Sequence, residues 1–341
     1  MCLMEKELDQ SLKAVGEDFG DYVVYSEQTK NLYALLKEYD FIPQIALIPS
    51  IITRDLEKVL IHELKEVNVT VITPSDTWDY FRSRFSPLNK ESGIADFFYL
   101  PDYVFVVNAY AKERAICEGV PEEKIIVTGN PHFEYLGMAY QQNKINQNVK
   151  QLKQEWKIKP DHNIIIFASE GLSQLLLQNS HEYPGYNEVE VLKVVSETLK
   201  KFSNPIFLLI TIHPYEDPTT FLQQPFLKNI QHRICKNLNP LSAIKLADIV
   251  IGMRSMFLIE AAFLGKRTIS YQPISASNDQ YFGNVSGITN PCYEPDVLEN
   301  KIAQFLENQG KQVISLMQPQ NATQNVIELL DRFSTSHSQN L

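Results

Sequence analysis

Short runs of β-branched and aliphatic residues alternate with longer segments of helical periodicity along nearly the whole chain. This alternation is typical of α/β folds with parallel sheets. The predicted strands are Tyr22–Tyr25, Ile45–Ile48, Val67–Ile72, Tyr103–Val107, Ile125–Val127, Asn163–Ala168, Ile206–Thr211, Arg233–Cys235, Asp248–Ile251 and Thr268–Tyr271. The predicted helices are Glu5–Val15, Thr29–Glu38, Arg54–Val67, Asp76–Phe85, Tyr110–Glu118, Glu188–Phe202, Pro240–Ala247, Ser255–Leu264, Pro295–Glu307 and Ala322–Phe333.

A polar segment, Gln141–Lys153, separates two such patterns. It has no aromatic residue and is rich in Asn, Gln and Lys, which indicates a hinge followed by a helix start. The length of 341 residues also points to about two domains. We expect an N-terminal Rossmann-like domain over 1–142, a C-terminal one over 143–333 whose last helix can pack back on the first domain, and a disordered tail over 334–341.

The composition is that of a globular protein, with 44% hydrophobic and 21% charged residues. A formal net charge of −10 argues against general binding to nucleic acid or anionic membranes and leaves room for a local basic pocket. The four cysteines form no CxxC pair, as expected of reduced thiols. The first residues lack a signal-peptide core, and the longest apolar stretch, Ile206–Ile212, is too short to span a bilayer. We expect a cytoplasmic protein with at most peripheral membrane association.

The most informative segment is ADIVIGMRSMFLIEAAFLGKRTISYQP, which begins at Ala247. A predicted strand ends at Gly252, which permits a tight turn and the close approach of a ligand. A helix then opens near Arg254, Ser255 and Met256. Free backbone amides and the positive dipole end at a helix start suit a phosphate or diphosphate, to which the arginine adds charge.

Glu260 lies about two turns into this helix, among apolar residues. Accepting hydrogen bonds from the vicinal hydroxyls of a ribose would explain it, and the alternative is a carboxylate that is merely solvated. The segment resembles the nucleotide-diphosphate site of GT-B glycosyltransferases and their relatives, which include UDP-N-acetylglucosamine 2-epimerase-like proteins and glycerophosphotransferase-like polymerases. In that superfamily the helix start holds the diphosphate and a Glu of the same helix binds the ribose.

Three further segments resemble the same group in the same order: SDTWDYFRSRF at Ser75–Phe85, VTGNPHFE at Val127–Glu134 and ITIHP at Ile210–Pro214. The resemblance covers roughly Tyr22–Leu306. It implies two Rossmann-like domains that face each other across a cleft, with Gly129 and Asn130 of the second segment among the donor-binding residues.

Two residues at predicted strand ends are candidate phosphate ligands. His213 would contact the diphosphate or the leaving phosphate, although a lone histidine is more often structural. Ser169 stands where the family often has a loop near the donor phosphates, and a plain turn and helix cap is the alternative. His132, which follows the Gly-Asn-Pro turn, is a weaker candidate at the same cleft.

Asp76 and Glu27 follow predicted strands of the first half, and either is a candidate base for an acceptor hydroxyl. For Asp76 the alternative is a helix N-cap. The chain departs from the family at its start, where the helical stretch Glu5–Val15 replaces a strand and a Gly-rich turn. This suggests that one βα unit is missing, which shortens the N-terminal domain.

These observations predict a metal-independent GT-B glycosyltransferase that needs no cofactor. It would move a sugar from a nucleoside-diphosphate-sugar donor to a surface polysaccharide or glycolipid acceptor. A nucleotide-sugar 2-epimerase, a CDP-polyol phosphotransferase and a non-catalytic nucleotide-sugar-binding protein are the alternatives. The motifs of dinucleotide-binding, P-loop, zincin and α/β-hydrolase enzymes are absent from the sequence.

Overall fold

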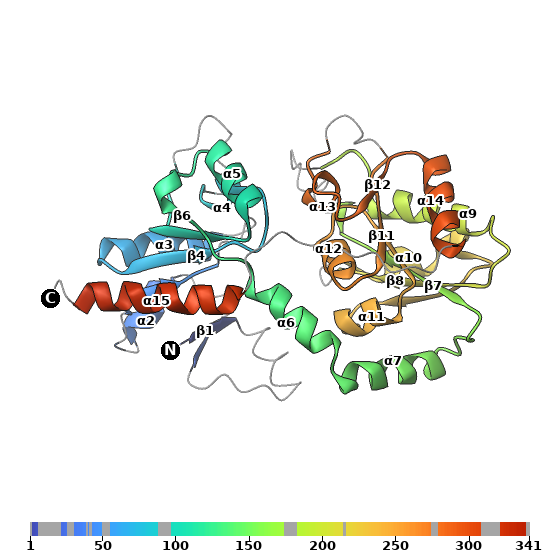
Figure 1. Ribbon diagram of the computed structural model, residues 1–341, viewed down its shortest axis with the longest axis horizontal. Coiled ribbons are helices and arrows are strands. Elements are labelled where there is room, and N and C mark those ends of the chain that lie inside the picture. The colour runs from blue at the N-terminus through green and yellow to red at the C-terminus, as the bar shows by residue number, and fades with distance from the viewer. Residues whose placement is uncertain are drawn as a thin grey trace. The chain divides into compact units, whose positions relative to one another are not determined.

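The computed structural model describes residues 2–5, 22–25, 31–38, 40, 43–49, 55–87, 97–173, 183–213, 216–273, 279–307 and 321–338. The chain divides into two compact units (Figure 1). Unit 1 consists of Met1–Pro131 together with Met317–Leu341, and unit 2 is His132–Leu316. The boundary therefore falls eleven residues before the one that the polar segment suggested, and unit 1 is discontinuous in sequence.

Unit 1 contains a parallel sheet of order β3-β4-β5-β6 and a separate parallel pair, β1-β2. The strands are β1 (Cys2–Glu5), β2 (Tyr22–Tyr25), β3 (Ile45–Leu47), β4 (Thr70–Pro74), β5 (Tyr103–Val106) and β6 (Ile125–Val127). The helices are α2 (Leu32–Glu38), α3 (Leu56–Glu66), α4 (Phe81–Arg84), α5 (Ala109–Cys117), the 3₁₀ turn η1 (Glu122–Lys124) and α15 (Ala322–Ser338).

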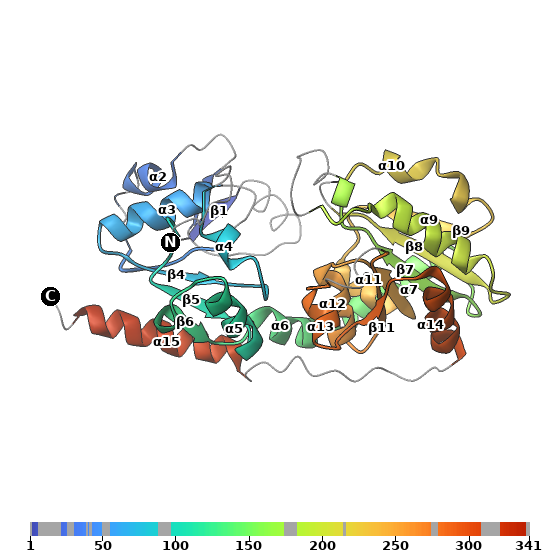
Figure 2. The same cartoon turned by 90° about the horizontal axis from the view of Figure 1, so that it is seen from above.

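Helix α15 packs on unit 1 although about 190 residues separate it from β6. The ring of Phe333 stacks on that of Tyr103 with centroids 4.5 Å apart, and Asn325 donates a hydrogen bond to the carbonyl of Thr128. Figure 2 shows the helix running beside β5 and β6. A ring contact and a hydrogen bond from a side chain to a backbone carbonyl thus join the two sequence parts of unit 1.

Unit 2 is built on a six-stranded parallel sheet of order β12-β11-β10-β7-β8-β9. The strands are β7 (Asn163–Ala168), β8 (Ile206–Thr211), β9 (Gln231–Cys235), β10 (Ile249–Gly252), β11 (Arg267–Tyr271) and β12 (Asn290–Cys292). The helices are α6 (Pro131–Tyr140), α7 (Asn143–Glu155), α9 (Glu188–Leu199), α10 (Thr219–Leu222), η2 (Pro225–Leu227), α11 (Pro240–Leu246), α12 (Met256–Phe263), α13 (Phe282–Val285) and α14 (Pro295–Glu307).

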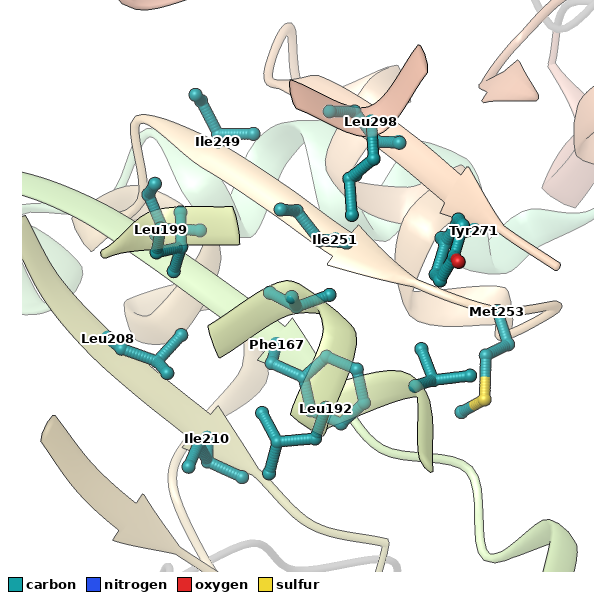
Figure 3. Close-up of a cluster of buried hydrophobic side chains, with 14 of the residues drawn as sticks. Phe167, Leu192, Leu199, Leu208, Ile210, Ile249, Ile251, Met253, Tyr271 and Leu298 are labelled. Carbon is teal, nitrogen blue, oxygen red and sulfur yellow. The ribbon is translucent and has the colours of Figure 1, made fainter. Parts of the chain in front are cut away.

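The core of unit 2 follows from the alternation of side chains along its strands (Figure 3). Ile165 and Phe167 of β7 point to the same face of the sheet, where α9 contributes Leu192 and α14 contributes Leu298. The intervening residues point to the other face, where Trp156 at the end of α7 stacks on Phe207. Both faces are covered, which explains why the central strands are apolar without interruption.

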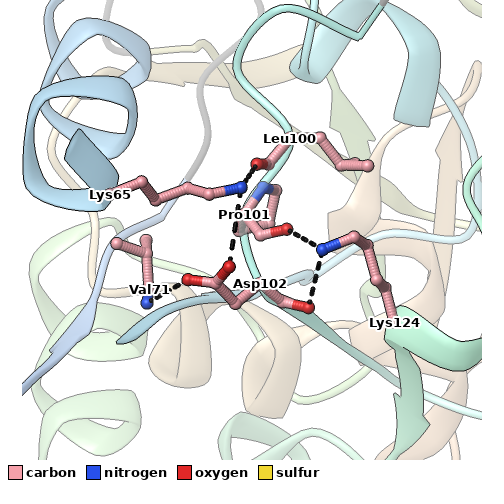
Figure 4. A network of polar contacts seen from close by, with 6 residues as sticks. All are labelled: Lys65, Val71, Leu100, Pro101, Asp102 and Lys124. Atoms are coloured by element: carbon pink, nitrogen blue, oxygen red, sulfur yellow. Dashed lines mark hydrogen bonds and ion pairs between the residues drawn. The ribbon is translucent and has the colours of Figure 1, made fainter. Parts of the chain in front are cut away.

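An Asp–Lys arrangement fixes the amino ends of strands in unit 1 (Figure 4). Asp102, just before β5, accepts a hydrogen bond from the amide of Val71 in the neighbouring strand at 2.9 Å. Lys124, just before β6, donates to the carbonyls of Pro101 and Asp102. Lys65 adds an ion pair to Asp102 at 3.5 Å.

Unit 2 repeats this arrangement in a different sequence context. Asp248, just before β10, accepts from the amide of Ile164 in β7 at 2.7 Å. Lys266, just before β11, donates to the carbonyls of Lys245 and Ala247. The two halves therefore resemble each other in this detail as well as in architecture.

Several predicted boundaries are wrong. Strand β4 begins at Thr70 instead of Val67, because α3 continues to Glu66 and Asn68 turns the chain with a left-handed φ of 60°. Glu5, which was predicted to begin a helix, is the last residue of strand β1. The other residues of that predicted helix, up to Val15, lie outside the described residues.

The predicted disordered tail, 334–341, is also wrong in part. Helix α15 continues to Ser338, so this segment begins inside a helix. The hydroxyls of Ser334 and Thr335 donate back to the carbonyl of Asp331, which accommodates polar residues in the last turns. Strand β12 and helices α6, α10 and α13 were not predicted.

Candidate functional site

Strands β7 and β10 lie side by side at the centre of the unit 2 sheet, and the connections from them run in opposite directions. In open α/β sheets this switch point leaves a crevice outside the carboxyl ends of the strands. Gly252 at the end of β10 is paired with Ala168 at the end of β7, so the two loops that follow start at the same level.

Gly252 is required by the packing of the chain itself. A Cβ atom at this position would lie 3.1 Å from the carbonyl oxygen of Ala168 and 3.4 Å from Cδ1 of Leu258. The contact of β10 with β7 and α12 is thus one reason for a glycine here. The role of Gly252 in a tight turn and in the approach of a ligand stays a prediction.

Ser255 is the N-cap of α12, and its hydroxyl accepts a hydrogen bond from the amide of Phe257 at 3.2 Å. Its carbonyl accepts from the hydroxyl of Tyr281 at 2.8 Å, which fixes the start of the helix. Within the part of the chain that the structure describes, the backbone amides of Ser255 and Met256 have no hydrogen-bond partner. These two amides are the donors that the corner offers to a ligand.

A carboxylate of the protein occupies the preceding amide. Glu170, two residues after β7, accepts a hydrogen bond from the backbone N–H of Arg254 at 2.7 Å. Burial raises the pKa of Glu170, and the charge and amide of Arg254 partly offset this rise. The protein thus places one of its own carboxyl groups beside the amides that were predicted to bind a phosphate.

Glu260 is paired with His132, the second residue of α6. His132 Nε2 lies 2.7 Å from Glu260 Oε1, and the two side chains are 46% and 15% exposed. Next to this pair the rings of Phe133 and Phe263 meet edge to face, with centroids 5.4 Å apart. Glu260, which was predicted to bind the ribose, is therefore a mostly buried carboxylate that is paired with a histidine.

Ser169 and His213 follow β7 and β8, and a buried carboxylate joins them. Glu216 accepts hydrogen bonds at 2.5 Å from the Ser169 hydroxyl and from the backbone amide of His213. Burial raises the pKa of Glu216, and these hydrogen bonds oppose the rise. Partial burial lowers the pKa of His213, so its ring is neutral at pH 7 and can serve as a hydrogen-bond donor.

In unit 1, the candidate base Asp76 is far more exposed than the unit 2 carboxylates described above. The side chain of Asp76 is 74% exposed and lies 3.4 Å from Arg84. It is not a helix cap, because α4 begins five residues later at Phe81, after Tyr80 in a left-handed conformation. Glu27 lies outside the described residues. In the turn after β6, Gly129 has a φ of 83° and Asn130 is buried.

Sequence analysis missed the polar residues that build the carboxyl edge of unit 2. Glu188 is 2% exposed and accepts from the amide of Ser173 at 2.9 Å. Asp279 accepts from the amide of Tyr281 and from the hydroxyl of Tyr293, and so organises the loop beside α12. Only Glu170 carried a usable signal, which was its place directly after a predicted strand end.

A hollow of about 470 Å³ lies at the opposite, amino edge of the same sheet. Its cationic side chains are engaged by the chain: Lys245 with the carbonyl of Tyr140, and Arg267 with the carbonyl of Phe305. Helices α11 and α12 end at this edge, where their dipoles are negative. The carboxyl edge is therefore the better site for an anionic ligand.

Metal-binding clusters and membrane-spanning helices are both absent from the described part of the chain. No group of three or more His, Cys, Asp or Glu side chains is arranged to hold a metal ion. No helix in these ranges is long and apolar enough to cross a bilayer.

Two parallel α/β units of this kind define a GT-B-like fold, which confirms the fold class predicted from the sequence. UDP-GlcNAc 2-epimerase from Neisseria meningitidis, solved bound to UDP-GlcNAc, is similar with a TM-score of 0.68 at 17% identity, over 97% of this chain and 91% of its own. The wall teichoic acid polymerase TagF is similar with a TM-score of 0.53 at 13% identity, over 93% of this chain and 78% of its own.

HepE from Anabaena, solved with UDP and glucose, is a third similar structure, with a TM-score of 0.58 at 11% identity over 99% of this chain and 91% of its own. No protein-family model matches the sequence, and no curated protein matches it. At identities of 17% and below, these likenesses establish the fold.

Proposed function

We propose that the protein is an enzyme that binds a nucleoside-diphosphate sugar at the carboxyl edge of unit 2 and transfers the sugar to a surface polysaccharide or glycolipid acceptor. The observation that carries the proposal is the corner after β10. There the amides of Ser255 and Met256 have no partner in the described chain, and Glu260 follows on the same helix. Two of the similar solved structures were obtained with UDP-GlcNAc and with UDP and glucose, which supports this ligand class.

The spacing along α12 fits such a ligand. Glu260 lies five positions after Ser255, which is about 7.5 Å along a helix axis. The amides at the helix start would bind the diphosphate, and the carboxylate would accept hydrogen bonds from the ribose hydroxyls. Arg254 and the neutral ring of His213 would stabilise the negative charge that develops on the departing diphosphate.

The acceptor would be activated from unit 1. The side chain of Asp76 is exposed beside Arg84, and a carboxylate that an acceptor can reach suits a general base. Glu27 is the second candidate for this role. Substitution of Asp76 by Asn should abolish transfer while leaving donor binding intact if Asp76 is the base.

A nucleotide-sugar 2-epimerase is the second candidate function, because 2-epimerases are prominent among the similar folds. That chemistry abstracts a proton next to the anomeric carbon and therefore needs acid/base carboxylates beside the donor. At this edge Glu188 and Glu216 are buried and are held by serine hydroxyls and backbone amides. Glu170 is partly exposed, accepts from the amide of Arg254 and lies close to the corner, so it is the carboxyl group best placed for such a role. Incubation with UDP-GlcNAc alone separates the two, since an epimerase turns over without an acceptor.

The test of donor binding is a thermal-shift screen against UDP-, GDP-, CDP- and dTDP-sugars, with wild type and Glu260→Ala compared. We expect one class of base to raise the melting temperature of the wild type and the substitution to remove most of that shift. A preference for CDP-polyols would instead favour phosphotransfer. Absence of any shift, together with no binding by calorimetry, would reject all the enzymatic functions and leave a non-catalytic protein.

A further inference from the structure

The contact between His132 and Glu260 joins two helices that lie far apart in sequence. His132 is in the first turn of α6 and Glu260 is in the second turn of α12, and the Nε2 to Oε1 distance is 2.7 Å. The neighbouring contact of Phe133 with Phe263 sets the same two helices against each other. The packing of these two helices therefore holds the histidine and the carboxylate close to each other.

We propose that His132 is a positioning residue for Glu260, and that it holds one carboxylate oxygen so that the other is presented to the ribose of the nucleotide. This inference rests on the proposed function. A carboxylate has two oxygens and about four acceptor positions, so a single donor from His132 leaves Oε2 available for vicinal hydroxyls. No described contact engages Oε2 of Glu260.

The contact orders Glu260 before the nucleotide arrives. A free glutamate side chain loses rotamer entropy when it is ordered, and the histidine contact meets that cost in the unliganded protein. The affinity for the ribose therefore depends on His132, whereas binding of the base and the diphosphate does not use this contact.

The alternative is a purely structural link between α6 and α12. Such a link would change the stability of the protein without changing its preference for one sugar over another. The ratio of affinities for a ribonucleotide and for its 2′,3′-dideoxy counterpart separates the two roles, because both nucleotides carry the same base and diphosphate.

The experiment is isothermal titration calorimetry with UDP, GDP and CDP and with their 2′,3′-dideoxy forms, on the full-length wild type, His132→Ala, His132→Gln and Glu260→Ala. Hydrogen bonds to a charged group contribute about 1.5–3 kcal/mol, so the wild type should prefer the ribonucleotide about tenfold or more. His132→Ala should reduce the ratio to about threefold or less, by weakening the ribonucleotide alone. His132→Gln should recover most of the preference, because its amide can donate to the same oxygen.

His232→Ala is the matched control, since His232 is an exposed histidine of unit 2 whose ring contacts only the carbonyl of Ile230 among the described contacts. It should keep the wild-type ratio. An unchanged ratio in both His132 variants would overturn the inference, and so would a wild type that binds both nucleotides equally. If the alanine variant does not fold, His132→Phe takes its place, because it keeps an aromatic ring and removes the donor, and the same fall of the ratio is expected. A wild type that binds no nucleotide would remove the proposed function and this inference together.

Discussion

At the scale of single residues, unit 2 keeps carboxylates where an anionic ligand is expected. Glu170 accepts a hydrogen bond from the amide of Arg254, and the buried Glu216 accepts one from the hydroxyl of Ser169. Glu188 is close enough to raise the pKa of both carboxyl groups. The sequence contains 41 acidic residues, and of these three only Glu170 stands out, by its place two residues after a predicted strand. The partners of all three are serines and amides of other loops, which only the folded chain brings together.

The raised pKa of Glu170 predicts how Glu170→Gln will act. A carboxyl whose pKa is raised by folding contributes stability that is present below the pKa of the unfolded chain, about 4.3, and is lost as the pH rises through the folded value. The glutamine can still accept from Arg254 and buries no charge. We therefore expect the variant to melt above the wild type at pH 8, by an amount equivalent to about 1.4 kcal/mol for each unit of pKa displacement.

The gain should shrink as the pH falls toward 4.3, which melting curves between pH 4.5 and pH 8 will show. Glu197→Gln serves as the control, because Glu197 forms an exposed ion pair with Lys200. A Glu170 variant whose advantage is the same at every pH would contradict the assignment of the shift to this group.

At the scale of elements, the alternation of apolar and helical segments predicted the central strands well, because β7, β8 and β10 are buried on both faces and read as continuous apolar runs. It failed where a left-handed residue decides a boundary, as at Asn68 before β4 and Tyr80 before α4. It also failed for β12, since three residues (Asn290–Cys292) carry too little pattern to be recognised without their partner strand. In such places tertiary contacts decide the structure.

Two glycines of unit 2 predict opposite effects of the same substitution. Gly252→Ala would place Cβ 3.1 Å from the Ala168 carbonyl and force β10 away from β7, which should lower the free energy of unfolding by about 1–3 kcal/mol. Gly137→Ala meets open space within α6 and should raise that free energy by up to about 1 kcal/mol. Urea denaturation of both variants measures the pair, and equal effects would show that the contact with β7 is not what requires Gly252.

At the scale of the whole molecule, the sequence predicted two α/β units but placed their boundary at the polar segment, which turned out to be mostly helix α7. The composition shows where the chain becomes polar, whereas the boundary between the units depends on contacts between residues, which the composition does not contain. For the candidate site, the sequence located the corner after β10 and Glu260, and it could not supply the partners of either. The contacts of His132 and Glu170 come from loops and helices that only folding brings together.

Removal of residues 317–341 tests whether the end of the chain belongs to unit 1. The deletion takes away the stack of Phe333 on Tyr103, the hydrogen bond of Asn325 to Thr128, and the buried Ala322. We expect faster amide hydrogen exchange in β5 and β6, with exchange in β7, β8 and β10 unchanged as the internal control. Equal loss of protection in both units, or none in either, would contradict the assignment of α15 to unit 1.

The placement of α15 also has a consequence for protein synthesis. A ribosome completes every strand of unit 2 before it makes the helix that unit 1 requires. Unit 2 can therefore complete its sheet on the growing chain while the surface of unit 1 that receives α15 is still uncovered. The last packing step of unit 1 thus follows the synthesis of unit 2, although the first strands of unit 1 emerge earlier.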